Sequence, residues 1–146
     1  MPVVIRRATL EDVPAIRSIE QQSLSAAHWT AGEYAKLITT GVILVAEQES
    51  QLCGFVCATA VAGEWELENV VVASPLHRQG IADSLMRALL HQAERSGALK
   101  VLLEVRESNL AARGLYEKHN FRETGRRRSY YQNPLEGAIL CEYRFQ

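Results

Sequence analysis

The residues best able to do chemistry lie close together in the second half of the chain: Glu104, Asn109 and Tyr116. Glu104 interrupts an apolar run, where a carboxylate is costly to bury unless it is paired or functional. It could be a general base, or it could pair with Arg106 or another cation. Tyr116 could donate a proton to a leaving group, although tyrosine at an apolar helical position usually packs in a core. Asn109 could cap a helix or turn its amide toward a ligand.

A second candidate site is the segment 70–82, where an apolar strand-like run passes through a short loop into a long amphipathic helix. The N–H groups at the start of a helix attract anions, and Gly80 would leave a ligand room to approach them. We therefore expect a phosphate or diphosphate site, with a loop that binds nothing as the alternative. The chain lacks the three-glycine Rossmann pattern and the P-loop ending, so neither a nucleotide cofactor nor ATP is indicated.

The composition is that of an ordinary folded protein. The 146 residues are 47% hydrophobic, carry a formal net charge of −1 and fit a single domain spanning residues 1–146. A chain so near neutrality is no general binder of nucleic acid, and no apolar run is long enough to cross a membrane. We recognise no export signal and expect a cytoplasmic protein.

The cysteines and histidines predict neither disulfides nor a metal site. Three cysteines without an export signal argue against a disulfide framework. Cys53 and Cys57 have even spacing in one predicted strand, which places both on one face as small buried residues. The histidines lack metal-ligand spacing, so we expect no metal.

Hydrophobic periodicity and turn residues predict one mixed α/β sheet with helices on both faces. The predicted order is a strand, two helices, three strands, a helix, a strand, a helix and two strands. Strands are expected at residues 3–7, 42–46, 52–60, 65–73, 99–105, from 121 onward and at 138–145. Helices are expected to start near Thr9, Thr30 and Gly80, and after a cap at Ser108 or Asn109.

In combination these segments resemble the GNAT superfamily of acetyl-CoA-dependent N-acetyltransferases along nearly the whole chain. Within it, the resemblance is strongest to the bacterial ribosomal-protein alanine N-acetyltransferases (the RimI type). The resembling segments are 67–72, 78–82, 103–106, 108–109, 115–117, 120–121, 127–131 and 136–138. The resemblance implies a mixed, mostly antiparallel central sheet whose strands splay at the cofactor site.

The resemblance also implies a role for each candidate residue. Glu104 would accept a proton, directly or through water, and Tyr116 would protonate the departing thiolate. The backbone of residues 70–72 would hold the pantetheine arm of acetyl-CoA, and residues 78–83 would wrap its diphosphate. The implied cofactor contacts are Val70, Val71, Val72, Arg78, Gln79, Gly80, Ile81, Ala82, Asp83 and Asn109.

The acceptor implied by the resemblance is a protein N-terminal α-amino group, in this subgroup the alanine of a small-subunit ribosomal protein. Lysine, a polyamine or another small amine is the alternative acceptor. An α-amino group loses its proton more easily than lysine, so it suits a moderate base such as Glu104. A nucleic-acid-binding module is a further alternative, since three arginines at 126–128 precede two tyrosines, but the net charge disfavours it. The candidate acceptor-binding residues are Trp29, Glu68, Tyr130 and Tyr131.

Three positions depart from the pattern of the family. His77 stands where Gln or Arg usually opens the phosphate loop, and His28 replaces the usual proline before Trp29. Gly137 replaces an aspartate. We expect these departures to alter cofactor contacts and acceptor choice more than the chemistry.

Overall fold

The computed structural model describes residues 2–23, 28–61, 63–73, 80–132 and 135–146, and its elements follow the predicted order. A 3-10 turn is added before the first helix. The strands are β1 (Val4–Arg7), β2 (Gly41–Gln48), β3 (Gln51–Val61), β4 (Glu64–Val72), β5 (Lys100–Arg106), β6 (Arg122–Tyr131) and β7 (Glu136–Arg144). The helices are η1 (Leu10–Asp12), α1 (Val13–Gln21), α2 (Ala31–Thr40), α3 (Ile81–Arg95) and α4 (Leu110–Lys118).

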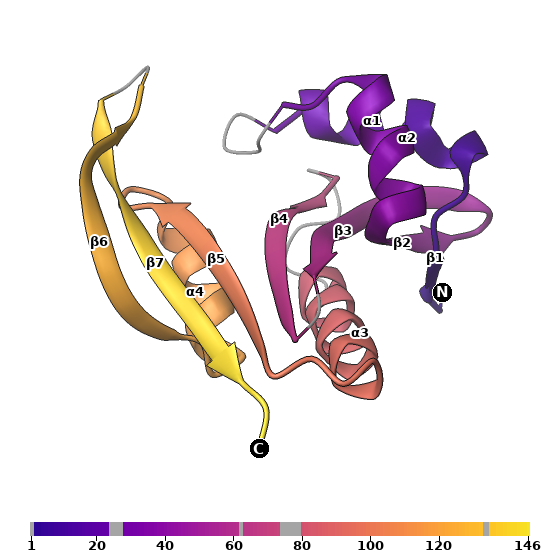
Figure 1. Cartoon of the computed structure of the whole chain (residues 1–146). Helices are drawn as coiled ribbons and strands as arrows, with labels where there is room; N and C mark the ends of the chain where they lie inside the picture. Colours follow the sequence, from indigo (N-terminus) through magenta and orange to yellow (C-terminus); the bar gives the residue numbers. More distant parts are fainter. Residues whose placement is uncertain (1, 24–27, 62, 74–79, 133–134) are drawn as a thin grey trace.

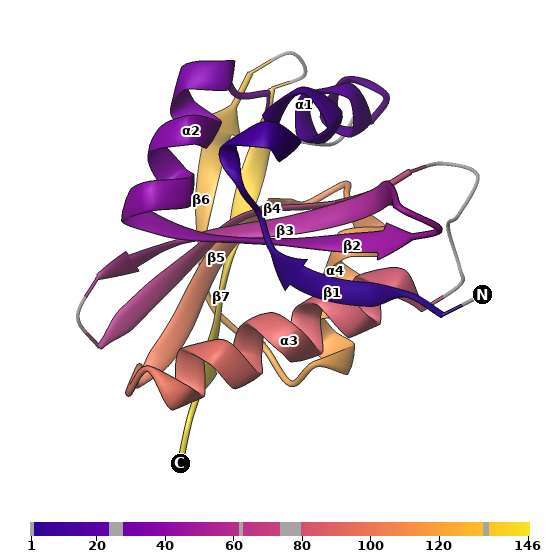
Figure 2. The same ribbon diagram turned by 90° about the vertical axis from the view of Figure 1, so that its right-hand side faces the viewer.

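The strands form one seven-stranded sheet in the order β1-β2-β3-β4-β5-β7-β6. Neighbouring strands are antiparallel except β4 and β5, which run parallel (Figure 1). Helices α1 and α2 cover one face of the sheet, and α3 and α4 cover the other (Figure 2). The predicted mixed, mostly antiparallel sheet with helices on both faces is therefore confirmed.

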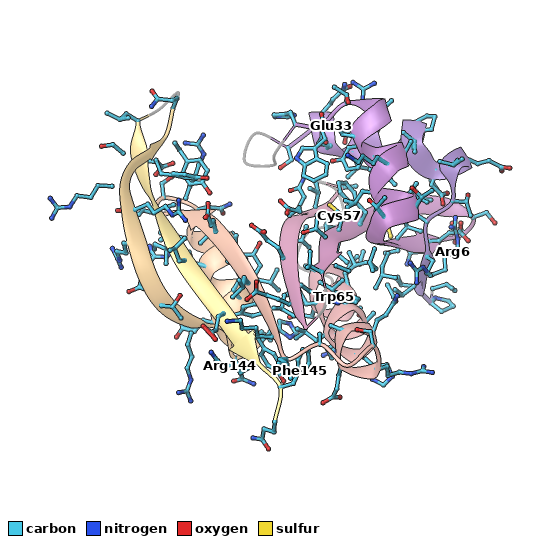
Figure 3. The ribbon with its side chains drawn as sticks, in the orientation of Figure 1. Arg6, Glu33, Cys57, Trp65, Arg144 and Phe145 are labelled. Carbon is cyan, nitrogen blue, oxygen red and sulfur yellow. The ribbon has the colours of Figure 1, made fainter. Side chains whose placement is uncertain are left out.

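Hydrophobic clusters on the two faces of the sheet hold these layers together. Burial of their apolar side chains supplies the main favourable term of folding. Cys57 belongs to the cluster beneath α1 and α2, whereas Trp65 belongs to the cluster beneath α3 and α4. Both lie inside the molecule in Figure 3, while Arg6 and Arg144 lie on its outside. The predicted apolar stripe of α3 is buried in the second cluster.

The start of α1 is anchored to β1 by an ion pair. The Arg6 guanidinium donates to both carboxylate oxygens of Asp12, at 2.8 and 3.0 Å, and the N–H of Thr9 donates to the same group at 2.7 Å. The Arg6 guanidinium holds the pKa of Asp12 below its ordinary value. The helix start that Thr9 and Asp12 predicted is therefore confirmed, as η1 leading into α1.

A β-bulge in β3 separates the two cysteines predicted to share a face. Consecutive residues of β2 pair with Gly54 and Leu52, so Cys53 between them has no opposite residue on β2. An extra residue of this kind reverses the alternation of side chains beyond it. Cys53 joins the α3 side and Cys57 the α1–α2 side, so the prediction of one shared face is wrong.

A second bulge, in β4, lies at Glu68. Consecutive residues of β3 pair with Asn69 and Leu67, and Glu68 is skipped. Leu67 accordingly packs on the α3 side of the sheet, whereas Val71 packs on the α1–α2 side. The bulge therefore moves each side chain of β4 that follows it to the opposite face of the sheet from the one that strict alternation would give.

The sheet opens between β4 and β5. These two strands pair only over residues 64–66 and 100–102, after which both continue without pairing to each other. Figure 1 shows the two strands diverging from that point. The splay that the resemblance implied is confirmed, and it divides the sheet into an N-terminal and a C-terminal part.

Candidate active site

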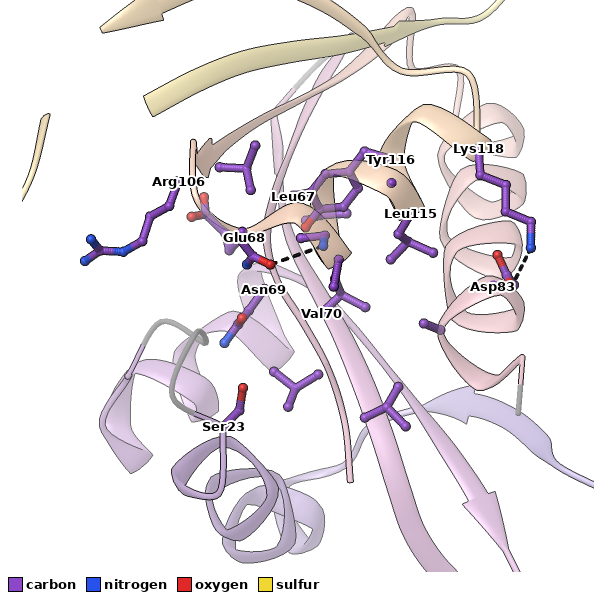
Figure 4. A pocket seen from close by; sticks show the side chains of 18 of the residues that line it. Ser23, Leu67, Glu68, Asn69, Val70, Asp83, Arg106, Leu115, Tyr116 and Lys118 are labelled. Atoms are coloured by element: carbon purple, nitrogen blue, oxygen red, sulfur yellow. Dashed lines mark hydrogen bonds and ion pairs between the residues drawn. The ribbon is translucent and has the colours of Figure 1, made fainter. Parts of the chain in front are cut away.

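A pocket of about 870 Å³ opens where β4 and β5 diverge. Its walls come mainly from these two strands, the start of α3 and helix α4 (Figure 4). The predicted site residues that line it are Glu68, Val70, Val71, Val72, Gly80, Ile81, Ala82, Asp83, Glu104, Asn109, Tyr116 and Tyr131. The structure therefore brings the predicted catalytic residues and most of the predicted cofactor contacts into one cavity.

Beyond its short pairing with β5, strand β4 directs backbone groups toward this pocket. The N–H of Ala73 donates to the carbonyl of Cys53 at 2.9 Å, which marks a hydrogen-bonded pair with β3. Because such pairs alternate along antiparallel strands, Val71 also bonds to β3. The peptide groups of Val70 and Val72 consequently point away from β3, toward the opening beside β5. An extended ligand can pair with β4 there as another strand would.

Gly80 begins α3 at the rim of the pocket with a left-handed backbone, φ +78° and ψ 8°. Glycine alone adopts this conformation without strain. The N–H groups of residues 81–83 lie in the first turn, where no residue of the helix itself accepts from them. Together with the helix dipole they suit an anion. Arg78 and Gln79, which were predicted to contact the diphosphate, and the departure at His77 lie outside the described residues.

The Asp83 carboxylate faces α4 and is held there by the side chains of Lys118 and His119. Lys118 Nζ lies 3.0 Å from one oxygen (Figure 4). His119 Nε2 lies 2.9 Å from the other. The Lys118 ammonium, followed by His119, holds the pKa of Asp83 below its ordinary value. The negative charge beside the proposed anion site is thereby balanced. Sequence analysis missed this contact because the partners are 35 and 36 residues away and carry no local signal.

Glu104 lies on β5 at the pocket wall, with 25% of its side chain exposed. The guanidinium of Arg127, on β6, is 3.7 Å from its carboxylate, a long ion pair of low strength. Arg106, the alternative partner considered from sequence, forms its ion pair with Glu136 at 3.1 Å and lies over the ring of Tyr131. Glu104 therefore remains accessible from the pocket, as a proton acceptor must be.

Helix α4 and its N-cap residue contribute two polar groups to the lining of the pocket. Asn109 caps the helix, accepting the N–H of Ala112 at 3.2 Å, so the capping role considered from sequence is confirmed. Tyr116 is 6% exposed, and its ring packs 5.8 Å from that of Phe121, centroid to centroid. Burial raises the pKa of Tyr116, so its hydroxyl stays protonated at neutral pH. A neutral phenol in a cavity can donate its proton to a developing anion.

The bulge in β4 places Glu68 at the pocket wall as a second carboxylate (Figure 4). The hydroxyl of Thr59, on β3, donates to it at 3.3 Å. Burial, and secondarily the charges of Glu66 and Glu104, raises the pKa of Glu68. The pocket therefore presents carboxylates from both of the diverging strands.

The other predicted acceptor-binding residues differ in how they meet the pocket. Tyr131 lines it. Tyr130 is 46% exposed and packs against Tyr131, 5.2 Å between ring centroids, outside the lining. The ring of Trp29 packs on Tyr34 of α2, and Trp29 does not line the pocket. The preceding residue, His28, lines the pocket instead. The direction of a side chain in a loop or on an edge strand depends on tertiary packing, which the sequence did not reveal.

The thiols do not compete for a catalytic role. Burial raises the pKa of Cys53, Cys57 and Cys141, so none is an activated nucleophile. Among the described residues, no group of three or more histidine, cysteine or acidic side chains is placed to hold a metal ion. The same residues include no helix long and apolar enough to cross a membrane.

Comparison with known proteins identifies the family. Residues 9–121 match the Acetyltransferase (GNAT) family, a range that contains Gly80, Glu104 and Tyr116. The chain belongs to the GNAT family of acetyltransferases. This family uses acetyl-CoA as acetyl donor, so the chain is an acetyl-CoA-dependent N-acetyltransferase.

Several individual proteins and solved structures are similar to this acetyltransferase. The [ribosomal protein bS18]-alanine N-acetyltransferase of Escherichia coli (strain K12) is 33% identical over 132 residues, which is 88% of each chain. The crystal structure of the ribosomal-protein-S18-alanine N-acetyltransferase from Escherichia coli superposes with a TM-score of 0.88 at 30% identity, covering 98% of this chain and 94% of that one. Ard1 from Thermoplasma volcanium has a TM-score of 0.90 at 23% identity, covering 100% and 99%, and shows the shared fold alone. The resemblance found in the sequence is confirmed.

Proposed function

We propose that this acetyltransferase modifies the α-amino group of a protein N-terminus, with the N-terminal alanine of a ribosomal protein as acceptor. The observation that carries the proposal is the common pocket of Glu104 and Tyr116 at the divergence of β4 and β5. The names of the two Escherichia coli proteins support the choice of acceptor, since each denotes an alanine N-acetyltransferase of the same ribosomal protein.

The residues of the pocket suit acetyl-CoA, which would supply the acetyl group as a reactive thioester. The first-turn N–H groups of residues 81–83 behind Gly80 suit its diphosphate. The peptide groups along residues 70–72 suit the amides of its pantetheine arm, and Asn109 lies on the facing wall. The carboxylate of Asp83 does not oppose this binding, because its charge is balanced by α4.

In the proposed reaction both substrates are bound together and the neutral amine attacks the thioester carbonyl carbon directly. A C–N bond forms and the C–S bond breaks. Glu104 takes the proton that the amine loses, directly or through water, and the hydroxyl of Tyr116 gives a proton to the departing sulfur. Backbone N–H groups of β4 polarise the carbonyl oxygen and stabilise the oxyanion that develops on it. No covalent enzyme intermediate is required.

An α-amino acceptor suits this pocket better than lysine. An α-amino group has a pKa of about 7.7–8.0 and lysine about 10.4, so lysine costs roughly 3.5 kcal/mol more to deprotonate at neutral pH. A carboxylate such as Glu104 is a moderate base and has little capacity to supply that difference. The chemistry of the base therefore favours a protein N-terminus over a lysine side chain or a polyamine.

Mass spectrometry of acetylated peptides tests the proposal. The enzyme and acetyl-CoA are mixed with a ribosomal-type peptide that begins with alanine, with the same peptide blocked at its α-nitrogen but carrying one lysine, and with a polyamine. We expect acetylation of the free α-nitrogen and of neither control. Acetylation of lysine or the polyamine at an equal or greater rate would contradict the proposed acceptor.

A further inference from the structure

Among the charged side chains that the structure describes, Glu20 of α1 is the most deeply buried, at 1% exposure. The reaction proposed above makes no use of it. A buried carboxylate is costly to the fold unless its oxygens are fully engaged by other groups. The partners of Glu20 therefore show which parts of the molecule it holds in place.

The Glu20 carboxylate joins the segment after α1 to helix α2. One oxygen accepts the backbone N–H of Trp29 at 3.0 Å and also the hydroxyl of Tyr34. The other oxygen lies 3.4 Å from Nδ1 of His28. Trp29 stacks on Tyr34, with 5.6 Å between ring centroids, which packs the same two segments together through their rings. Glu20 thus fixes both the backbone and the side chains of residues 28–29.

The same chain of contacts reaches β4. Tyr34, which is fully buried, hydrogen-bonds Asn69 as well as Glu20. Asn69 directly follows the bulged Glu68 and lines the pocket, as His28 does. In Figure 4, Asn69 points from β4 toward the end of α1. Two parts of the pocket wall, far apart in sequence, are therefore held by one buried carboxylate.

We propose that Glu20 is a positioning residue for the acceptor: through Trp29 and Tyr34 it fixes the wall formed by His28 and Asn69. The identity of the acceptor rests on the function proposed above. Glu20 lies on the α1–α2 side of the sheet, whereas the anion site at Gly80 belongs to α3 on the other side. Loss of Glu20 should therefore impair use of the acceptor and leave the affinity for acetyl-CoA nearly unchanged.

Steady-state kinetics with the alanine peptide tests this division. Glu20→Ala is expected to raise the KM for the peptide about tenfold or more, while the Kd for acetyl-CoA stays within about twofold. Glu20→Gln keeps an oxygen that can accept from Trp29 and Tyr34, so it should restore most of the loss. Tyr34→Phe removes the hydroxyl that joins Glu20 to Asn69 but leaves the bond between Trp29 and Glu20, so it should give an intermediate KM. Ile19→Val, which shortens a buried side chain of the same helix and leaves the polar contacts of Glu20 in place, is the matched control and should leave KM unchanged.

Acrylamide quenching of tryptophan fluorescence gives a readout that needs no substrate. Trp65 is 5% exposed and thus shielded, so quenching reports mainly on Trp29. Quenching should increase in Glu20→Ala, less so in Tyr34→Phe, and not in Ile19→Val. Should Glu20→Ala fail to fold, Tyr34→Phe and Glu20→Gln carry both measurements.

The two measurements separate failure of this inference from failure of the proposed function. If the wild type leaves the peptide unmodified but quenching responds to Glu20 as expected, the acceptor is wrong and the positioning role stands. If the peptide is acetylated but neither its KM nor quenching responds to Glu20, the positioning role is wrong. The positioning role is also wrong if Ile19→Val raises the KM as much as Glu20→Ala does.

Discussion

Replacement of Gly80 by alanine is expected to weaken acetyl-CoA binding out of proportion to its effect on stability. Gly80 has a φ of +78°, and a Cβ atom placed there meets no atom of the described residues within 4 Å. The penalty therefore comes from the backbone conformation, which costs a non-glycine residue about 1–2 kcal/mol. In a domain of this size that loss corresponds to a thermal midpoint lower by roughly 3–6 °C.

Gly97, just beyond the other end of α3, supplies a matched control. Its φ is +87°, and a Cβ atom there also meets nothing within 4 Å in the part of the chain that the structure describes, so Gly97→Ala should cost the same stability. Gly97 does not line the pocket. Relaxation of residue 80, in contrast, displaces first-turn N–H groups. The loss of one hydrogen bond to a charged group, about 1.5–3 kcal/mol, would weaken binding about 10- to 150-fold.

Calorimetric titration of acetyl-CoA into the wild type and both variants, well below their thermal midpoints, measures this difference. We expect a similar loss of thermal stability in both variants and a large rise in Kd for Gly80→Ala alone. An unchanged Kd for Gly80→Ala, or an equal rise for Gly97→Ala, would refute the assignment of an anion site to the start of α3.

Three further predictions concern the carboxylates and the phenol. Glu104→Gln and Tyr116→Phe should each lower kcat about 10²- to 10⁴-fold with little change in the Kd for acetyl-CoA, measured by peptide kinetics and calorimetry; wild-type turnover would refute both roles. Glu68→Gln should raise the peptide KM without lowering the thermal midpoint at pH 7. Burial raises the pKa of Glu68, so protonated Glu68 stabilises the fold, and this stabilisation is lost as the pH rises through the raised pKa. A clear drop in the thermal midpoint of Glu68→Gln at pH 7 would contradict this reasoning. Asp12→Asn should cost about 1.5–3 kcal/mol of unfolding free energy at pH 7. Arg6 holds the pKa of Asp12 below its ordinary 3.8, so this stabilisation is present above that value and is lost as the pH falls through the lowered pKa. Denaturant curves of this variant and the wild type should then converge in strong acid, and a gap that persists there would argue against the ion pair.

The order of the elements could be predicted because local signals determine it. The apolar stripe of α3, with Leu85 and Leu89, has helical spacing, and both residues are fully buried. Helix α2 starts after Thr30 as predicted, and the Thr30 hydroxyl accepts the N–H of Glu33 at 3.1 Å. The resemblance to the family predicted that Glu104 and Tyr116 act at one site. Their spacing in the sequence is that of a residue on a strand and a residue on the helix that follows it. These features depend on neighbours a few residues away in the chain.

What could not be predicted depends on pairing between distant segments. The bulges at Cys53 and Glu68 arise from the register between strands, and no residue type in either strand signals them. They reversed the expected face of a cysteine and placed a second carboxylate in the pocket. The surroundings of Gly137 also depend on segments distant in the sequence. A Cβ atom at this position would collide with the carboxylate of Glu107 and lie 3.0 Å from the carbonyl oxygen of Arg127. A larger residue would require this corner of the molecule to rearrange.

The short pairing of β4 with β5 also has a thermodynamic consequence. A ligand that binds only the folded chain raises the free energy of unfolding with the logarithm of its concentration, by about 2.7 kcal/mol at a hundredfold excess over Kd. Acetyl-CoA lying along the open edge of β4 would complete the centre of the sheet and so act as a structural component as well as a reactant. The resistance of this enzyme to unfolding and proteolysis would then rise and fall with the metabolic supply of its own donor.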